Sequence, residues 1–533
     1  MRAMFILSSI LMLAFVGIVA FFWPPILWLL LGIVPLIGIG IYDMLQCTHA
    51  VLRNFPIIGH FRYLFEAIRP EINQYFIESN TDGVPYSREK RSVIYQRAKT
   101  ELDTVPFGTQ HDVYRLGYEW LNHSLAPKPV LHDPPRILIG EETCDKPYSA
   151  SLLNISAMSF GSLSKNAILA LNEGARRGGF AHNTGEGGLS PYHLEPGGDL
   201  IWQIGTGYFG CRKPDGGFDA EAFAERARLP QVKMIEVKLS QGAKPGHGGI
   251  LPKEKLTEEI AKIRLVPLGK DVLSPPHHSA FDTPKGLLDF VTRLRELAGG
   301  KPVGFKLCLG SRCEFLSILK GMLETGQHPD FITVDGAEGG TGAAPLEFSN
   351  SIGTPLGDGL AFVHNALVGC GLRRKLKILA AGKISTGFHM AAKLALGADA
   401  CNQARAMMFA LGCIQALRCN SNTCPTGVAT QDPALVAGLV VGDKAARVCH
   451  YHRITVRSLL ELVSAAGLEQ PSELRPWHVY RRVTQTEVKH LGQVYPMIEE
   501  GSILGPEPPK GFARPWHDAD ADRFVRGRTA EPV

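Results

Sequence analysis

The chain has 533 residues, of which 45% are apolar and 20% are charged, and its formal net charge is only +5. A chain of this length and composition can bury a large core, and one large domain with accessory segments fits it best. No long basic run accompanies the small net charge, so the sequence gives no indication of nucleic-acid binding.

The first 45 residues are strongly apolar. No charged residue stands between Ala3 and Tyr42, and at about 20 residues per crossing this length predicts two membrane spans with the turn at Pro24 and Pro25. Basic residues flank the two spans and are missing from the turn: Arg2, Arg53, Arg62 and Arg69. The positive-inside rule then predicts a hairpin anchor over residues 1–45 in the cell inner membrane, with the main domain facing the cytoplasm. A secretory signal is the alternative, but its apolar core should be only about 7 to 15 residues long.

Residues 46–149 combine aromatic and basic groups in helix-like patterns that Pro70, Pro85 and Pro106 interrupt. We expect a helical and irregular extension that covers the main domain. A surface that rests on lipid headgroups is the alternative for this segment.

From about residue 150, short apolar runs alternate with amphipathic helical stretches, a pattern typical of parallel strands joined by crossover helices. Eight candidate strands predict an α/β fold, a (β/α)8 TIM barrel over residues 150–431. The candidate strands are Leu152–Met158, Phe180–Asn183, Val232–Leu239, Asp271–Leu273, Val303–Leu309, Phe331–Asp335, Lys377–Ala381 and Asp399–Gln403. We expect residues 190–230 to be an insertion between strands, and residues 432–533 to form a C-terminal helical extension with a polar tail.

The loops after the last two expected strands are candidates for a phosphate site. TIM barrels commonly bind phosphate at these two positions through backbone N–H groups and a helix N-terminus. Gly382, Lys383 and Gly387 follow the seventh strand, and Ala404 and Arg405 follow the eighth. Glycine lets the backbone approach a phosphate closely, and Arg405 can add charge-assisted hydrogen bonds.

Lys306 stands inside an otherwise apolar candidate strand. A lysine that points into the barrel needs a partner, because burying an unpaired charge is costly. The alternative is a lysine that faces outward between helices.

Three cysteines lie close together in the sequence, at Cys413, Cys419 and Cys424. Their C-x5-C-x4-C spacing differs from the C-x2-C pairs of zinc sites. Three thiolates can hold an iron-sulfur cluster, because soft sulfur ligands suit iron. Such a cluster needs reduced cysteines, which agrees with a cytoplasmic location. Buried thiols without a ligand are the alternative.

The stretch Gly412–Gln431, GCIQALRCNSNTCPTGVATQ, resembles the cluster-binding segment of the glutamate synthase family, flavin-dependent enzymes in which C-x5-C-x4-C followed by P-x-G-V-A-T-Q carries a 3Fe-4S cluster. The run Met158–Ser162, MSFGS, is similar to a flavin-contacting segment of the same family. The resemblance covers about residues 150–453. It implies a TIM barrel that binds FMN, with a 3Fe-4S cluster at Cys413, Cys419 and Cys424.

The resemblance also implies which residues contact FMN. In addition to the residues after the last two strands, they are Ala157, Met158, Ser159, Thr184, Gly339 and Gly340. Lys306 would then be both a cofactor ligand and a catalytic residue, with the reduced flavin as its partner. Where the family commonly has DGG and FGT, this chain has Ala381–Lys383 and Gln403–Arg405, so individual phosphate contacts are expected to differ.

Two further loops, Asn183–Gly188 and Gln241–Gly246, match family segments that line the 2-oxoglutarate pocket. The resemblance implies that Gln241, Lys244 and Arg264 bind substrate and that Glu186 and Lys244 take part in catalysis. A guanidinium can grip a carboxylate in a two-pronged hydrogen bond. Glu186 could orient or deprotonate the ammonium that becomes the imine, and a turn carboxylate that caps N–H groups is the alternative.

The function that the resemblance implies is that of an oxidoreductase acting on CH-NH2 donors. It is the reductive amination of a 2-oxo acid, most directly 2-oxoglutarate to L-glutamate, by imine formation and hydride transfer from reduced FMN. An external electron donor protein would supply electrons through the cluster. No stretch resembles the family's glutamine amidotransferase domain or a pyridine-nucleotide module, so ammonia is the expected nitrogen source.

Two other functions are open. The chain could be an FMN-dependent amino-acid or hydroxy-acid dehydrogenase that passes electrons to a membrane partner. It could also be a non-catalytic membrane electron-transfer subunit. The sequence does not indicate an oligomeric state.

Overall fold

The computed structural model describes residues 1–101 and 103–524. Leu102, in the expected N-terminal extension, and residues 525–533, the end of the expected C-terminal tail, lie outside the described residues. Residue contacts divide the chain into two units, Met1–Glu89 and Lys90–Val533, and the boundary falls inside helix α5 (Arg88–Lys99).

The first unit begins with two apolar helical stretches long enough to cross a membrane. They are Arg2–Phe22 with 21 residues and Pro24–Leu45 with 22 residues. At about 1.5 Å per residue each reaches about 30 Å, the thickness of a hydrocarbon core. The elements of this unit are α1 (Arg2–Phe22), a 3-10 turn (Pro24–Leu29), α2 (Leu30–Leu45), α3 (Ala50–Asn54), α4 (Gly59–Ile72) and a π turn (Asn73–Ile77).

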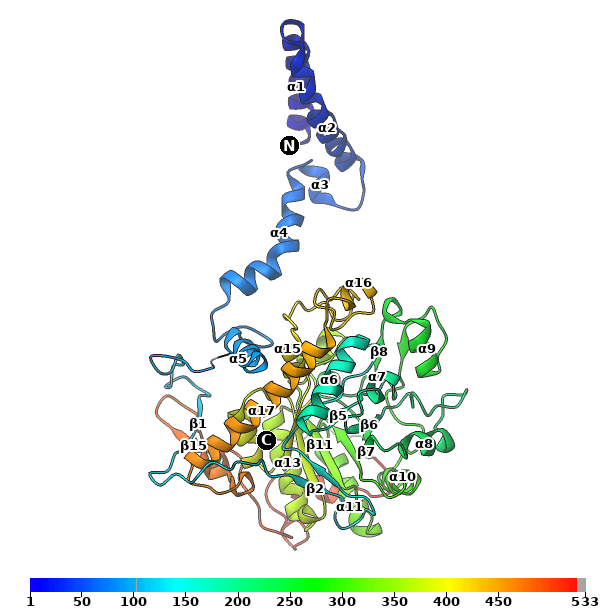
Figure 1. The fold of residues 1–533 in the computed structure, drawn as a ribbon, viewed down its shortest axis with the longest axis vertical. Helices are drawn as coiled ribbons and strands as arrows, with labels where there is room; N and C mark the ends of the chain where they lie inside the picture. Colours follow the sequence, from blue (N-terminus) through cyan, green and yellow to red (C-terminus); the bar gives the residue numbers. More distant parts are fainter. Residues whose placement is uncertain (102, 525–533) are drawn as a thin grey trace. The chain divides into compact units, whose positions relative to one another are not determined.

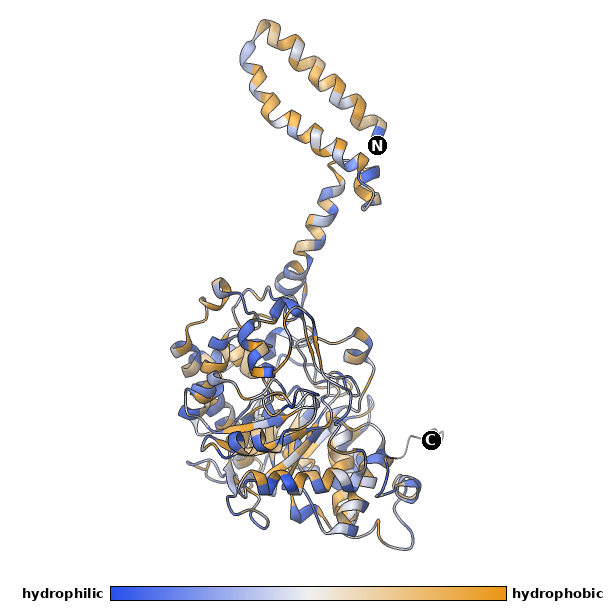
Figure 2. Cartoon of the chain, turned by 90° about the vertical axis from the view of Figure 1, so that its right-hand side faces the viewer, coloured by the Kyte–Doolittle hydropathy of each residue, from blue (hydrophilic) through white to orange (hydrophobic). Residues whose placement is uncertain are grey.

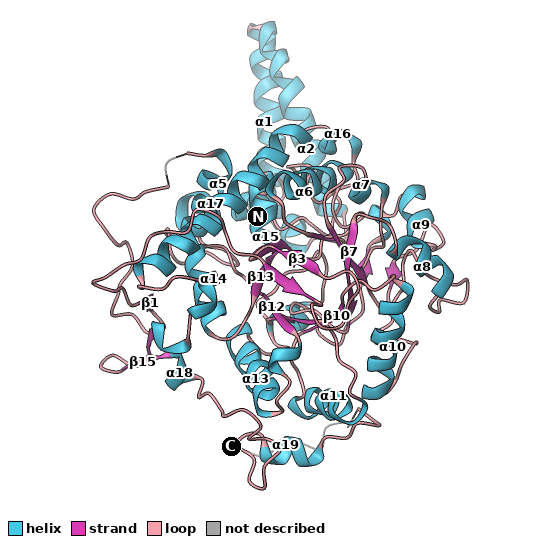
Figure 3. Cartoon of the chain, turned by 60° about the horizontal axis from the view of Figure 1, so that its bottom comes forward, coloured by secondary structure: helices cyan, strands magenta, loops and turns pink. Residues whose placement is uncertain are grey.

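The second unit contains a closed barrel of eight parallel strands, which confirms the predicted α/β TIM barrel. Each strand pairs with the next barrel strand along the chain, and the last pairs with the first. The barrel strands are β4 (Leu153–Ile155), β5 (His182–Asn183), β6 (Leu200–Ile204), β7 (Val232–Lys238), β10 (Val303–Leu307), β11 (Phe331–Asp335), β12 (Lys377–Ala381) and β13 (Ala400–Gln403). Figure 3 shows these strands surrounded by helices.

One predicted barrel strand was wrong. The segment expected at Asp271–Leu273 forms β9 (Val272–Leu273), which pairs antiparallel with β8 (Ile250–Leu251) outside the barrel. The missing barrel strand is β6, inside the stretch expected to be an insertion, and all five of its residues are buried. Glycines at Gly198 and Gly205 border this short run, which made it look like part of a loop.

Helices cover the outside of the barrel, and side chains define where several of them begin. The side-chain oxygens of the N-cap residues of α6, α9, α10, α11 and α14 accept backbone N–H groups from the first turn, which satisfies donors that have no partner inside the helix. The main helices are α6 (Lys165–Gly178), α8 (Ala220–Ala227), α9 (Glu258–Arg264), α10 (Pro284–Leu297), α11 (Arg312–Thr325), α13 (Leu356–Gly369), α14 (Gly387–Ala395), α15 (Arg405–Leu411) and α17 (Val441–Ala465).

The segments before and after the barrel are part of the same unit. The antiparallel pair β2 and β3 packs its buried side chains Ile139 and Tyr148 against barrel residues such as Ile201 and Phe331. Near the C-terminus, β14 pairs with β1 and β15, so this region holds strands in addition to the expected helices. The remaining elements are β1 (Glu119–Leu121), β2 (Ile137–Ile139), β3 (Tyr148–Ala150), α7 (Pro191–Leu194), α12 (Leu346–Asn350), α16 (Pro433–Val436), β14 (Val479–Arg482), β15 (Val488–His490), α18 (Leu491–Val494), α19 (Ala513–Asp518) and 3-10 turns at Lys253–Lys255, Arg373–Lys375, Pro471–Glu473 and Pro476–His478.

Candidate active site

Charged side chains gather at the carboxyl ends of the barrel strands. Lys238 is the last residue of β7, Asp335 is the last of β11, and Lys306 lies one residue before the end of β10. Because all eight strands are parallel, these ends meet at one mouth, which is where TIM barrels carry catalysis. The predicted substrate and cofactor residues follow the same strand ends.

One buried carboxylate joins four strands beneath this mouth. Glu236 in β7 is fully buried and accepts three hydrogen bonds. The donors are Asn183 Nδ2 at 2.7 Å, Gln203 Nε2 at 2.7 Å and Thr333 Oγ1 at 2.6 Å, from β5, β6 and β11. Burial of a carboxylate is tolerated where donors satisfy its oxygens. This polar layer holds the strand ends in register below the mouth.

Lys306 points into the barrel, as the sequence predicts, and its partner in this structure is a carboxylate of the chain. Its Nζ lies 3.0 Å from Asp335 Oδ2, and both side chains are almost fully buried. Burial alone would lower the pKa of Lys306, but the charges of Asp335 and Glu236 outweigh burial and raise that pKa. Lys306 is therefore a permanent ammonium at the mouth.

Glu186 lies within a group of three cations. Its Oε1 is 2.8 Å from Lys238 Nζ, which also donates to Gln241 Oε1 at 2.6 Å. Burial would raise the pKa of Glu186, but the charges of Lys238, Lys244 and Arg264 lower it overall. Glu186 is thus a carboxylate at neutral pH, and the group of Glu186 and these cations, here called the cationic group, has two positive charges in excess.

Lys244 and Arg264 are buried cations with hydrogen-bonding capacity to spare. Lys244 Nζ donates to Ala343 O at 3.0 Å, and Arg264 Nη2 donates to Phe160 O at 3.1 Å. Arg264 Nε has no hydrogen-bond partner among the described residues. Burial lowers the pKa of Lys244 to about 8 and that of Arg264 to about 10. Buried cations of this kind suit an anionic ligand.

The predicted phosphate loops bring further cations together. Burial lowers the pKa of Lys383, and the positive charges of Arg405 and Lys90 lower it further. Lys383 has φ of 46°, a left-handed conformation that is rare outside glycine and clusters at ligand sites. Gly340 approaches Arg405 so closely that an added Cβ would lie 2.7 Å from Arg405 Nε. Neighbouring cations at the ends of β12 and β13 fit the phosphate of FMN.

Gly387 has a packing role that the sequence did not reveal. A Cβ on Gly387 would lie 2.5 Å from the backbone nitrogen of Leu459, so glycine is needed for α14 to pack on α17. Ala404 is the residue that precedes α15, at the end of β13, as expected. A phosphate contact from Gly387 stays a prediction.

The loops that follow β4 and β5 pack against each other at the same mouth. Met158 N donates to Asn183 O at 3.1 Å, and Thr184 is fully buried. Gly185 has φ of 65°, and a Cβ on it would lie 2.9 Å from Ser159 N. The predicted FMN residues Ala157, Met158, Ser159 and Thr184 therefore lie on two loops in backbone contact.

The loops after β7 and β11 are in equally close contact. A Cβ on Gly242 would lie only 1.7 Å from Gly336 O, and one on Gly339 would lie 3.0 Å from the same oxygen. Gly242 N also donates to Asp335 Oδ2 at 3.1 Å. The predicted substrate loop, with Gln241, therefore adjoins the loop that carries Gly339 and Gly340.

Cys413, Cys419 and Cys424 lie on the loop after α15, and all three thiols are free. Burial raises the pKa of Cys413 to about 12 and also raises that of Cys419. Burial would raise the pKa of Cys424 too, but the Thr426 hydroxyl and nearby backbone N–H groups lower it overall. Within the described residues, no three His, Cys, Asp or Glu side chains are placed to hold a metal ion. The donor set and the N–H groups directed at sulfur suit an iron-sulfur cluster.

Two buried side chains connect this cysteine loop to the loop after β4. Lys255 Nζ donates to Ser162 O, to Cys419 O at 3.2 Å and to Ala429 O at 3.2 Å. Gln431 Nε2 donates to Gly161 O at 3.1 Å and to Leu163 O at 2.9 Å. The cysteine loop and the MSFGS segment are therefore held together by the protein itself.

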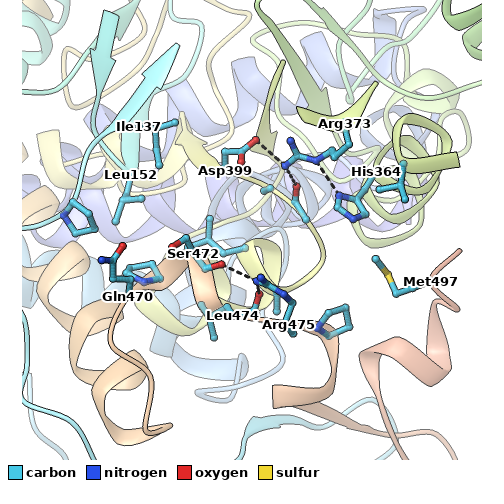
Figure 4. Close-up of a pocket in the computed structure, with 18 of the residues that line it drawn as sticks. Ile137, Leu152, His364, Arg373, Asp399, Gln470, Ser472, Leu474, Arg475 and Met497 are labelled. Carbon is cyan, nitrogen blue, oxygen red and sulfur yellow. Dashed lines mark hydrogen bonds and ion pairs between the residues drawn. The ribbon is translucent and has the colours of Figure 1, made fainter. Parts of the chain in front are cut away.

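A cavity of about 620 Å³ lies at the other end of the barrel. Leu152 and Asp399, which line it, directly precede β4 and β13 (Figure 4). Its central cation, Arg373, is held by Asp399 Oδ2 at 2.9 Å and His364 Nδ1 at 3.1 Å. Burial and the charges of Arg373 and Arg475 lower the pKa of His364 to about 4, so this histidine is neutral. These polar groups satisfy one another, and we assign the cavity no chemistry.

Sequence reasoning missed Lys238, Glu236 and Lys90, and it did not give Asp335 a role. Glu236 and Lys238 alternate in the predicted strand Val232–Leu239, and a period of two places both on one face. Two charges on one face of a parallel strand that is buried on both sides are a signal of a polar site inside the barrel. No comparable signal marks Lys90, which the fold brings to the phosphate loops from a distant segment.

Comparisons with known proteins identify relatives of this chain. The family described as the conserved region in glutamate synthase matches residues 119–469. Glutamate synthase large subunit-like protein YerD of Bacillus subtilis is 41% identical over 484 residues, which cover 83% of this chain and 92% of that protein. Archaeal-type glutamate synthase (NADPH) of Thermotoga neapolitana is 36% identical over 322 residues, which cover 60% of each protein. This chain thus spans less than two thirds of that relative's length.

Among solved structures, a double mutant of flavocytochrome b2 with pyruvate bound is 13% identical and covers 81% of this chain and 88% of its own. Its TM-score of 0.42 marks a likeness too remote to bear on function. The family match, by contrast, extends over more than half of this chain. The chain therefore belongs to the glutamate synthase family.

Proposed function

We propose that this protein is an FMN- and iron-sulfur-dependent oxidoreductase that aminates a 2-oxo acid reductively, converting 2-oxoglutarate to L-glutamate. The observation that carries this proposal is the cationic group around Glu186. A dicarboxylate brings two negative charges, which match the two positive charges in excess. Each charge-assisted hydrogen bond contributes about 1.5 to 3 kcal/mol.

The roles of the side chains follow from their protonation and their contacts. Arg264 and Lys244 would bind the substrate carboxylates, since both are buried cations with spare donors. Lys238, which is paired with Glu186 and donates to Gln241, would orient the reacting end of the substrate. Because Glu186 is ionised at neutral pH, it would accept a proton as ammonia attacks the 2-oxo carbon.

The residue types at these two places suit the chemistry of both implied cofactors. Lys383, Arg405 and Gly340 would hold the FMN phosphate, and Lys306 would donate hydrogen bonds toward the flavin. Bound FMN would supply the hydride. Cys413, Cys419 and Cys424 would hold a 3Fe-4S cluster, which would supply electrons received from an external donor protein.

The proposal includes a membrane anchor over residues 1–45, with the barrel on the cytoplasmic side of the cell inner membrane. The two apolar stretches support it by length and composition, as the hydropathy colours of Figure 2 show. Arg2 Nε donates to Arg53 O at 2.6 Å, so the start of α1 lies beside the segment that follows α2. Both ends of the hairpin would then be on one side of the membrane.

The experiment that tests this function is an anaerobic assay of detergent-solubilised protein with an artificial reductant. We expect the reduced flavin to be reoxidised, so that the absorption band of oxidised flavin returns and glutamate forms, only when 2-oxoglutarate and ammonium are both present. Glutamine should not replace ammonium. Bleaching of the oxidised flavin by an amino or hydroxy acid alone would instead indicate the dehydrogenase, and no response to either addition would indicate an electron-transfer subunit.

The affinity for 2-oxoglutarate is expected to fall as pH rises above about 8. Burial lowers the pKa of Lys244 to about 8, so its ammonium, which is present below that pH, is lost above it. One required proton predicts an increase in the dissociation constant of about fivefold between about pH 8 and about pH 9. Perturbation of the flavin spectrum by 2-oxoglutarate measures this constant without turnover. A Lys244→Arg variant keeps its charge and should show a flat profile, and an equal slope in this variant would contradict the assignment.

A further inference from the structure

Helix α4 carries an apolar face that no other part of its unit covers. Phe61, Leu64, Phe65, Ile68 and Ile72 recur at the spacing that places side chains on one side of an α-helix. All five are exposed, with 56% of Phe61 and 60% of Phe65 accessible. An exposed apolar face of this size marks a site of contact with a partner or a membrane.

The apolar face continues into the π turn that follows α4. Tyr75, Phe76 and Ile77 are also exposed there, with 84% of Phe76 accessible. At 100° per residue, Arg62 and Arg69 lie next to each other along one border of the apolar face. Long basic side chains at such a border can reach phosphate while their stems lie on apolar surface.

Polar contacts fix the start of α4 to the open end of the hairpin. Asp43, near the end of α2, is fully buried and accepts the backbone N–H of Ile57 at 2.9 Å and a hydrogen bond from His60 Nε2 at 2.9 Å. Arg2 Nη2 donates to Asn54 Oδ1 at 3.0 Å at the same end. This band of polar groups marks the level at which the apolar helices stop.

Helix α4 leaves the open end of the hairpin at an oblique angle to α1 and α2 (Figure 1). In both Figure 1 and Figure 2, α4 turns away from the direction of α1 and α2 and does not continue it. A helix that starts at the headgroup level and lies along the bilayer surface keeps its apolar face at that surface. This geometry is that of an interfacial helix.

We propose that the apolar face of α4 rests on a phospholipid surface, at the boundary between headgroups and acyl chains, with Arg69 directed at lipid phosphates and Arg62, whose Nη2 is paired with Glu66 Oε1 at 2.8 Å, beside it. This inference rests on the proposed membrane hairpin. It assigns α4 a lipid contact of its own, so that residues 59–77 form a second membrane element. The barrel of the same chain and a second copy of this chain are the other partners that the face could meet.

Photo-crosslinking of the full chain in phospholipid vesicles tests the proposal. The probe is p-benzoylphenylalanine, placed singly at Phe65 on the apolar face, at Glu66 on the opposite face and at Phe15 in α1. Glu66 is the matched control, since it is exposed and lies in the same helical turn. We expect at least about tenfold more lipid adduct at position 65 than at position 66, because the side chain at position 65 would face lipid and the one at position 66 would face water.

Labelling at the three positions distinguishes failure of the interfacial-helix proposal from failure of the membrane-hairpin proposal. Lipid adducts at position 15 without adducts at position 65 would overturn the inference and leave the hairpin intact. Absence of lipid at position 15 would overturn the hairpin and the inference that rests on it. Adducts at position 65 with barrel peptides or with a second copy, or equal lipid labelling at positions 65 and 66, would also contradict an interfacial helix.

Discussion

A Cys419→Ser variant is expected to lose its iron and acid-labile sulfide while it keeps its flavin. In the proposed cluster each of the three cysteines would bind one iron, and a serine oxygen is a poor ligand for iron at a position that needs soft sulfur. The backbone carbonyl of Cys419 also accepts a hydrogen bond from Lys255 Nζ at 3.2 Å, which helps to hold the cysteine loop in place. The serine leaves this hydrogen bond in place, so the loop should keep its fold. Iron and sulfide analysis, with the flavin spectrum, measures the result.

Cys313→Ser is the matched control. Cys313 is a free, partly exposed cysteine like Cys419, but it lies in α11, away from the loop after α15. Iron content should be unchanged in this variant. Purified protein that contains flavin but no iron, with all cysteines present and oxygen excluded, would refute the cluster proposal for this chain.

Lys306→Met is expected to lower the free energy of unfolding by about 3 to 5 kcal/mol, the typical cost of breaking a buried ion pair by removing one partner. The reason is that Asp335 would lose its cation in a site where its side chain is only 10% exposed. Glu236 would lose the same neighbouring cation. Denaturant titration of the barrel, followed by circular dichroism, measures the loss.

Two further variants test whether the broken ion pair between Lys306 and Asp335 causes this loss of stability. Lys233→Met removes a lysine whose Nζ lies 3.6 Å from Asp199 in a pair with side chains 37% and 35% exposed. That loss should be about 1 kcal/mol or less, as for other surface pairs. Adding Asp335→Asn to the Lys306→Met variant should recover at least about 1 kcal/mol of unfolding free energy, because the effects of substitutions at contacting residues are not additive. A double variant no more stable than Lys306→Met would show that the lost stability comes from packing and not from charge.

The barrel was predictable from the sequence because most of its strands are apolar runs between amphipathic helices. β6 and β9 show the limit of that reasoning. Leu200–Ile204 is a short run between glycines with only the four-residue helix α7 before it, whereas Asp271–Leu273 has the composition of a strand but only two paired residues. Strand pairing depends on contacts with distant segments, which local pattern does not report.

The candidate site was predictable only in part, because some of its residues are recognised by resemblance and others by their partners in the fold. Glu186, Lys244 and Arg264 were identified by family resemblance, and the structure brings all three within electrostatic reach of one another. Lys238 pairs with Glu186 and Asp335 pairs with Lys306. The sequence did not give these two residues a role, because the role of each depends on a partner from another strand or loop. Gly387 was predicted as a phosphate residue, while its closest constraint is the backbone of α17.

The hydrogen bonds of Gln431 couple the local opening of the cysteine loop to that of the loop after β4. Its side-chain amide ties the segment after the third cysteine to Gly161 O and Leu163 O, and Lys255 adds bonds to both sides. Neither loop can leave its place without breaking bonds that hold the other. Amide hydrogens of the two loops should therefore exchange with solvent together, as one cooperative opening unit, although Gly161 and Gln431 lie 270 positions apart in the chain.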